Sequence, residues 1–135
     1  MNLWKKFLLF YLGGMGYCGL ELLWRRRTHG SMFALGGLCF LVLGKIRQLP
    51  LPSWKKALTG SAAITLGEFL TGLAVNRSYE IWDYRRMPVN LRGHICLLYS
   101  LLWIPVSLAG MGLHRRLDRI IAKQLRRSAY TKGLK

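Results

Sequence analysis

One acidic residue, Glu68, lies within nineteen residues, Ala57–Val75, that carry no other charge. In a helix it would lie roughly 16 Å from one end of this stretch and roughly 10 Å from the other. That depth is near the middle of a hydrocarbon layer about 30 Å thick. A carboxylate there costs about 2.5–3.5 kcal/mol on insertion scales, and such residues usually serve a function or a polar helix contact. Two interpretations stay open: a proton-coupled or cation-binding carboxylate, and a hydrogen-bonding group that joins helices.

The residues around Glu68 predict a two-faced helix. Small and polar residues share its face at helical spacing, within about 60° on a helical wheel. These are Ser61, Ile64, Thr65, Thr71, Gly72 and Val75. The opposite side carries Ala62, Leu66, Leu70 and Leu73. The leucine side suits lipid, and the other side suits a neighbouring helix or a hydrated cavity. Thr65 and Thr71 therefore join Glu68 as candidate binding residues.

A second carboxylate, Glu21, stands near the end of the first apolar segment. Arg25 follows four residues later, so an i,i+4 ion pair or snorkelling towards the interface accounts for Glu21. Its helical face also carries Gly14, Tyr17 and Cys18, so this side chain could point into a bundle. Glu21 is the fourth candidate for an intramembrane polar site.

Several chemistries are missing from the chain. It has no nucleotide-binding Gly-x4-Gly-Lys-Ser/Thr, no His-Glu-x-x-His and no Gly-x-Ser-x-Gly sequence. His29, His94 and His114 are isolated, and the three cysteines form no Cys-x-x-Cys pair, which predicts buried free thiols. We therefore expect no catalytic residue, no metal site, no cofactor and no enzymatic activity.

The composition indicates an integral membrane protein. Of 135 residues 52% are hydrophobic, and the net charge is +16. The basic residues lie between long apolar runs, the arrangement of a membrane protein with basic loops rather than of a nucleic-acid-binding domain. We expect an all-α fold of about four membrane helices, at about residues 7–24, 32–46, 57–75 and 95–113. The second is short, and reaches spanning length only if it starts near Thr28 or if the bilayer thins.

The charge distribution predicts the topology. Residues 1–113 would form one four-helix transmembrane domain, and residues 114–135 a basic cytoplasmic tail. With both termini inside, the cytoplasmic segments carry 14 Lys and Arg residues and the outer segments 7. Basic residues are enriched in cytoplasmic loops, which favours N-in and C-in.

The tail begins with the basic sequence His114–Arg127. Leu117, Ile120, Ile121 and Leu125 fall near one helical face, while basic residues cover much of the rest. We favour an amphipathic helix lying on the anionic cytoplasmic leaflet. The alternative is a solvated continuation of the fourth span.

The loop at residues 76–94 holds a second group of candidate residues. Asp83 is expected to pair with an arginine and to fix the loop against the bundle. Asn90 could cap the fourth helix, and Gly93 permits a close approach of backbones. Both a structural connector and a substrate-recognition role stay open. The loop candidates are Asn76, Trp82, Asp83, Tyr84 and Asn90.

The order of residues from Ile64 to Trp103 resembles a family of small bacterial multi-pass membrane proteins, the putative type IV ABC-transporter permeases. The shared pattern reads IT..EF..G...N, then WDYS, then N..G.ICL..S..W, and Gly36–Phe40 and Gly44 also fit. The chain departs from the pattern at Arg85, where the family usually has Ser, and at His94, where it usually has Gln.

The resemblance implies a multi-pass protein of the bacterial cytoplasmic membrane, and names no solute. Because the nucleotide motif is missing, an ABC-type role would need a separate ATPase subunit. Four short spans enclose little volume, so a transport pathway would need a homo-oligomer or another membrane subunit. The lipid bilayer is the expected partner, and nucleic acid is not. Transport is the leading hypothesis, and a non-transporting membrane scaffold or assembly factor is the alternative.

Overall fold

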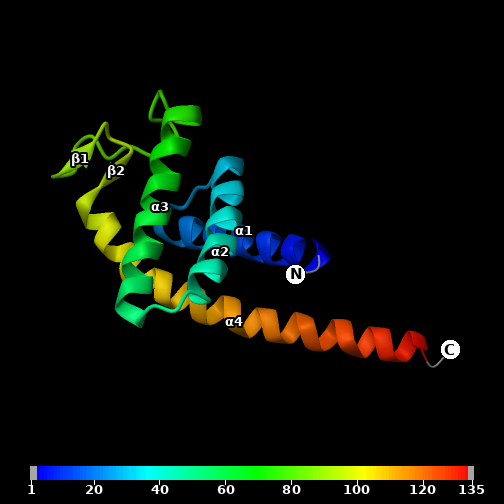
Figure 1. The fold of residues 1–135 in the computed structure, drawn as a ribbon. Helices are drawn as coiled ribbons and strands as arrows, with labels where there is room; N and C mark the ends of the chain where they lie inside the picture. Colours follow the sequence, from blue (N-terminus) through cyan, green and yellow to red (C-terminus); the bar gives the residue numbers. More distant parts are fainter. Residues whose placement is uncertain (1–2, 134–135) are drawn as a thin grey trace.

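Four helices and one short hairpin make up the computed structural model, which describes residues 3–133 (Figure 1). In chain order the elements are α1 (Leu3–Arg25), α2 (Gly30–Arg47), α3 (Ser53–Val75), β1 (Asn90–Leu91), β2 (Ile95–Cys96) and α4 (Leu97–Gly133). Each helix is long and apolar enough to cross a membrane. The predicted all-α membrane fold is therefore confirmed. Residues 1–2 and 134–135, at the ends of the predicted domain and tail, lie outside the described residues.

The second helix reaches spanning length without starting at Thr28. It begins at Gly30, and His29 caps it because its Nδ1 accepts a hydrogen bond of 3.1 Å from the Ser31 amide. Its 18 residues rise about 27 Å, close to the hydrocarbon thickness. The turn that follows ends at Pro52, which is extended and precedes α3.

The fourth helix differs from the prediction at both ends. Ile95 and Cys96, predicted to be helical, form β2, which pairs antiparallel with β1 in the register Leu91 to Ile95. At the other end, α4 continues without interruption through the predicted tail to Gly133. The predicted tail is thus helical as far as Gly133 and joined to the fourth span without a break. Figure 1 shows α4 bending near its first third, and Pro105, which removes a backbone donor, lies inside it.

Glycines bring α1 and α2 into close contact. A Cβ added at Gly14 would lie 2.7 Å from the carbonyl oxygen of Phe33, and one at Gly37 would lie 2.6 Å from that of Phe10. Only glycine fits at either position, because the obstacle is backbone and cannot rotate away. Small residues at such crossings are the usual way in which membrane helices pack, since lipid offers no hydrophobic drive between them.

Polar side chains join α3 to α4. The Ser61 hydroxyl donates to the Ser100 carbonyl oxygen at 2.5 Å, and the hydroxyls of Thr65 and Ser100 are 2.8 Å apart. Apolar packing continues beside these bonds, where Ile64 of α3 and Met111 of α4 share a buried cluster with Leu43 and Ile46 of α2. The face of α3 that was predicted to be polar is thus the face that packs on α4.

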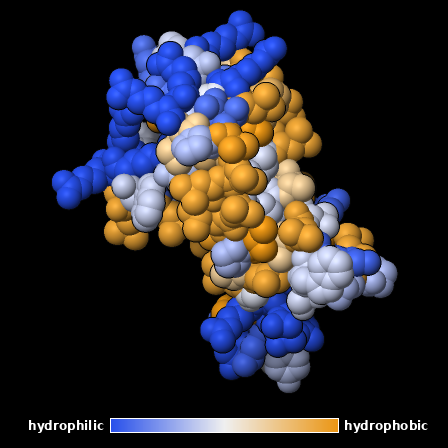
Figure 2. Space-filling view, turned by 90° about the vertical axis from the view of Figure 1, so that its left-hand side faces the viewer, coloured by the Kyte–Doolittle hydropathy of each residue, from blue (hydrophilic) through white to orange (hydrophobic). Residues whose placement is uncertain are grey.

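The leucine side of α3 faces outwards. Leu66 is 58% exposed and Leu70 is 55% exposed, as predicted for the lipid side. Figure 2 shows an apolar band across the middle of one face of the molecule, with hydrophilic side chains at both ends. This is the surface of a protein that sits in a bilayer, where the exposed apolar residues contact lipid.

The glycine contact leads to a stability prediction. Gly37→Ala places a methyl group against the Phe10 carbonyl, so α1 must shift, and we expect a loss of about 1–3 kcal/mol in unfolding free energy. Gly19→Ala is the control because a Cβ there meets nothing within 4 Å. It should be neutral or stabilise by up to about 1 kcal/mol through helix propensity. Thermal unfolding in detergent micelles, followed by circular dichroism, measures both, and equal melting temperatures would contradict the packing account.

Candidate functional site

Glu68 is buried inside the bundle, with 4% of its surface exposed. Side chains from two other helices interact with its carboxyl group, and they include Trp103 of α4 and Tyr17 of α1. The two rings stack on each other, with centroids 6.0 Å apart. The carboxyl group therefore lies near two aromatic side chains that each carry a hydrogen-bond donor.

Helix α1 presents three polar side chains on one face. Tyr17, Glu21 and Arg25 are spaced four residues apart, so they lie one above the other along the helix. The predicted pair forms, with 3.7 Å between Arg25 Nε and Glu21 Oε2. Both carboxylates, Glu21 and Glu68, lie within electrostatic range of each other, as does Arg25. The structure thus brings two acidic groups and one basic group into a single buried cluster.

Arg25 connects this cluster to the loop at residues 76–94. Its guanidinium donates a hydrogen bond to the Tyr84 hydroxyl and lies 5.2 Å from the centroid of the Tyr84 ring. Burial, and then the negative charge of Glu68, raises the pKa of Tyr84, so this phenol stays protonated. Tyr84 also stacks on Tyr99 at 4.9 Å. One arginine therefore ties the end of α1 to the loop and to the start of α4.

A pocket of about 330 Å³ adjoins the cluster between α1 and α4. That volume is at the lower end of the range for small-molecule sites. Its walls are mostly apolar and aromatic, with Glu21 and Arg25 as the charged members. The lining residues are Tyr17, Leu20, Glu21, Leu23, Trp24, Arg25, Tyr84, Tyr99, Leu102, Trp103 and Val106. We call this the upper pocket. Because Leu23 is 85% exposed and Trp24 is 71% exposed, one wall of the upper pocket belongs to the bundle surface.

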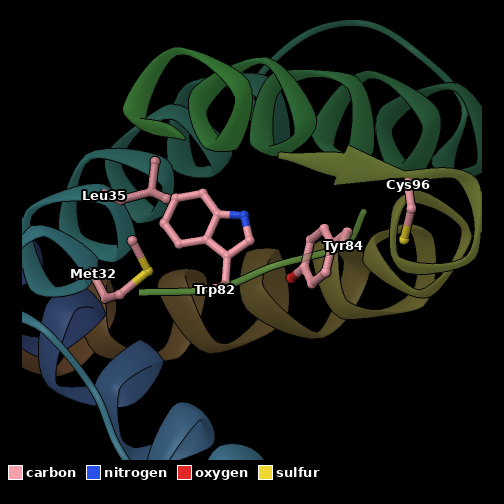
Figure 3. Packing of buried hydrophobic residues seen from close by; sticks show 5 residues of the cluster. All are labelled: Met32, Leu35, Trp82, Tyr84 and Cys96. Carbon is pink, nitrogen blue, oxygen red and sulfur yellow. The ribbon is translucent and has the colours of Figure 1, made fainter. Parts of the chain in front are cut away.

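The loop is packed into the protein by two aromatic residues. Trp82 is 4% exposed and Tyr84 is 6% exposed. Figure 3 shows the Trp82 indole lying against Leu35 and Met32 of α2. Its Nε1 donates to the His94 carbonyl oxygen at 2.9 Å. These contacts support the structural interpretation of the loop, since the side chains of Trp82 and Tyr84 are part of the buried core.

Asn76 organises the turn from α3 into the loop. It is fully buried, its Nδ2 donates to the Trp82 carbonyl oxygen at 2.6 Å, and its Oδ1 accepts from the Ile81 amide at 2.9 Å. Asn90 has a different role from the predicted one. It lies in β1, seven residues before α4, and its side chain bonds Met87 and Gly93 across the hairpin instead of capping the helix.

Asp83 forms the predicted ion pair, but within the loop. Its partner is Arg85, at 2.8 Å, and both side chains are exposed, so the pair does not fix the loop against the bundle. Hydrogen bonds from the Arg85 side chain and amide lower the pKa of Asp83 to about 2. The pair is therefore charged above the ordinary titration range of aspartate, and weakens only as the pH falls towards 2.

The two departures from the family pattern meet at one ring. The Arg85 guanidinium lies 4.0 Å from the centroid of Tyr79, and the His94 ring stacks on Tyr79 at 5.1 Å. Burial, followed by the charge of Arg92, lowers the pKa of His94, so this imidazole is neutral at pH 7. Arg85 and His94 therefore form one local packing unit with Tyr79.

The structure unites some of the predicted site residues and separates others. Glu68 and Glu21 meet in the buried cluster. Thr65 bonds Ser100 of α4, whereas Thr71 donates to the Gly67 carbonyl of its own helix at 2.7 Å. The sequence analysis did not propose Arg25 or Trp103 as site residues. Arg25 lies four residues after Glu21 on α1, and Trp103 lies four residues after Tyr99 on α4. This spacing is the sequence signal that could have identified Arg25 and Trp103.

The fold and the cluster define a polytopic membrane protein with ionisable groups inside its bundle. Comparison of the sequence with known protein families gives a more specific assignment. Residues 8–131 match the family described as Putative ABC-transporter type IV, so the chain belongs to that family. No curated protein and no solved structure matches the chain.

Asn76 provides a test of how the loop is held. Asn76→Ala leaves the Trp82 carbonyl and the Ile81 amide without partners, and we expect a loss of about 2–4 kcal/mol in unfolding free energy. Asn90→Ala is the matched control, because its side chain is exposed and water can replace its bonds. That control should lose less than about 1 kcal/mol. Thermal unfolding in detergent distinguishes the two, and similar losses would show that Asn76 is not the residue that anchors the loop.

Proposed function

We propose that this protein is a transport component of the membrane, in which Glu68 exchanges a proton or a cation. The observation that carries the proposal is the burial of Glu68, at 4% exposure, in the middle of a membrane-spanning helix. A buried carboxylate is costly, and a proton or a bound cation relieves that cost. Groups of this kind inside membrane bundles mark ion and proton pathways.

The upper pocket supplies a place for a solute beside the carboxyl group. Its aromatic walls and the nearby pair of carboxylates suit a small organic cation, because ring faces and acidic groups both attract positive charge. Tyr17 and Trp103 lie between the upper pocket and Glu68, since both residues line the pocket and interact with the carboxyl group. A rotation of either side chain would open the upper pocket to the carboxyl group.

A transport pathway of this kind needs further subunits. The upper pocket has a wall on the bundle surface, so a second copy or another membrane subunit would close it. Within this proposal the chain has no catalytic role. A separate ATPase subunit supplies the energy if the chain is an ABC-type permease subunit, and the cation or proton gradient supplies it if the chain forms a small homo-oligomeric transporter. The charge bias and the family support the bacterial cytoplasmic membrane as the location, with both termini inside.

The carboxylate role is tested by comparing Glu68→Gln, Glu68→Ala and the exposed control Glu80→Gln. In proteoliposomes challenged with a panel of organic cations, wild type and Glu80→Gln should give the same solute-dependent current. Glu68→Gln keeps the size of the side chain but cannot exchange a proton at neutral pH, so its current should fall at least tenfold. Capacitive current on a supported membrane measures this. Full current in a folded Glu68→Ala protein would exclude the carboxylate from transport.

The alternative is a membrane scaffold or assembly factor that carries no solute. The observation in its favour is that Ser61 and Thr65, on the Glu68 side of α3, bond Ser100 of α4. In this case Glu68→Ala should lower the melting temperature or the oligomeric state, and no cation should give a current. Purification of the tagged protein from its own membrane separates the two proposals: a stoichiometric ATPase favours transport, and an unrelated membrane enzyme favours the scaffold.

A further inference from the structure

A second charged cluster lies at the opposite end of α1 from Arg25. Asp118 of α4 pairs with Lys5 of α1 at 2.6 Å, and with Arg47 of α2 at 3.7 Å. The side chains are partly exposed, at 15% for Lys5 and 21% for Arg47. The cluster therefore joins three helices at one end of the bundle, and two positive charges face one negative charge.

This cluster has unused hydrogen-bond donors and acceptors. Arg47 Nε is buried and has no hydrogen-bond partner among the described residues, and the same holds for Nδ1 of His114. His114 is 1% exposed and lies against the ring of Phe40. A buried guanidinium N–H without an acceptor is rare in proteins, because losing its contact with water is costly. The exposed parts of Lys5 and Arg47 carry the excess positive charge to the surface, where an anionic group would balance it.

An apolar pocket of about 340 Å³ leads away from this cluster, between α1 and α4. None of the residues that line it is charged. They are Leu12, Gly13, Gly16, Tyr17, Leu20, Gly36, Cys39, Phe40, Leu43, Ile64, Trp103, Val106, Ala109, Gly110 and Leu113. We call it the lower pocket. It shares Tyr17, Leu20, Trp103 and Val106 with the upper pocket, so the two are neighbouring parts of one groove.

Each of three helices leads directly from the lower pocket to the charged cluster. Along α2, Arg47 lies one turn beyond Leu43, and along α4, Asp118 lies five residues beyond Leu113. At 1.5 Å per residue these steps are about 6 Å and about 8 Å. Along α1, Lys5 lies seven residues, or about 10 Å, before Leu12. On each of these three helices the charged cluster thus lies within about two turns of the apolar groove.

We propose that this end of the protein binds one anionic phospholipid of the surrounding bilayer. Its phosphate lies against Lys5 and Arg47, and one of its acyl chains occupies the lower pocket. A basic group at the membrane surface above an apolar groove is complementary to such a lipid in both charge and depth. A helix of a second copy is the competing occupant, but a second copy carries the same net charge of +16 and so does not balance the positive charge at this end.

The test uses native mass spectrometry of the full-length protein, released from micelles that contain equal amounts of phosphatidylglycerol and phosphatidylcholine with the same acyl chains. We expect one phosphatidylglycerol retained per chain. Lys5→Gln should weaken its retention about fivefold, since each basic residue contributes about that factor. Asp118→Asn removes the competing carboxylate, so retention of phosphatidylglycerol should increase by a similar factor.

The groove is tested by Gly16→Leu, which fills the lower pocket. A side chain fits there without an internal clash, because a Cβ at Gly16 meets nothing within 4 Å. Gly112→Leu is the matched control: it has equally open space, and Gly112 does not line the pocket. Gly16→Leu should lose the bound lipid at least fivefold while Gly112→Leu keeps it, and both should melt like wild type.

Three results would overturn the proposal. Equal retention of the two lipids would remove the role of Lys5 and Arg47. Weaker retention in Asp118→Asn would show that the cluster only holds helices together. A dimer that carries no lipid, and that Gly16→Leu dissociates, would assign the groove to a second copy of the chain. None of these outcomes depends on transport through Glu68.

Discussion

The cost of placing the Glu68 carboxyl group inside four membrane helices constrains the rest of the structure. A charge at that depth needs neighbours that compensate for lost water. The protein supplies them from two other helices: Tyr17 and Arg25 on α1, and Trp103 on α4. Those side chains can come together only if α1 packs on α2 and α4 packs on α3. The glycine contacts hold α1 against α2, and the hydrogen bonds of Ser100 hold α4 against α3.

The loop at residues 76–94 completes the same network from outside the spans. Arg25 is the last residue of α1, and it would be a surface residue if its guanidinium did not donate a hydrogen bond to Tyr84. Tyr84 is placed there because Trp82 is inserted beside α2, and Trp82 is held in turn by Asn76 and by the His94 carbonyl. A loop of this kind is not a simple tether between helices. It is a buried part of the fold that positions one charged residue at the membrane boundary.

Local patterns predicted the helices well because each carries its own signal. The spans follow from uncharged runs of sufficient length, and the lipid side of α3 follows from the spacing of Leu66 and Leu70. The ends of α4 did not follow in the same way. Ile95 and Cys96 are apolar like the helix behind them, and only pairing with Asn90 and Leu91 makes them a strand. The pair of Glu21 and Arg25 was predictable from spacing, whereas the approach of Glu21 to Glu68 was not, since 47 positions separate them.

The sequence by itself determined that the protein lives in a membrane, how many helices it has, and that one carboxylate is buried in the third. Those properties depend on composition and on periods of a few residues, which are local. The tertiary structure alone decided that Arg25, Tyr84 and Trp103 surround this carboxylate, and that Asn90 belongs to a hairpin. It also decided that a groove runs between α1 and α4 towards Lys5. These features depend on which helix faces are in contact, and that is set by the close fit at Gly14 and Gly37, a property of shapes that meet only after the chain has folded.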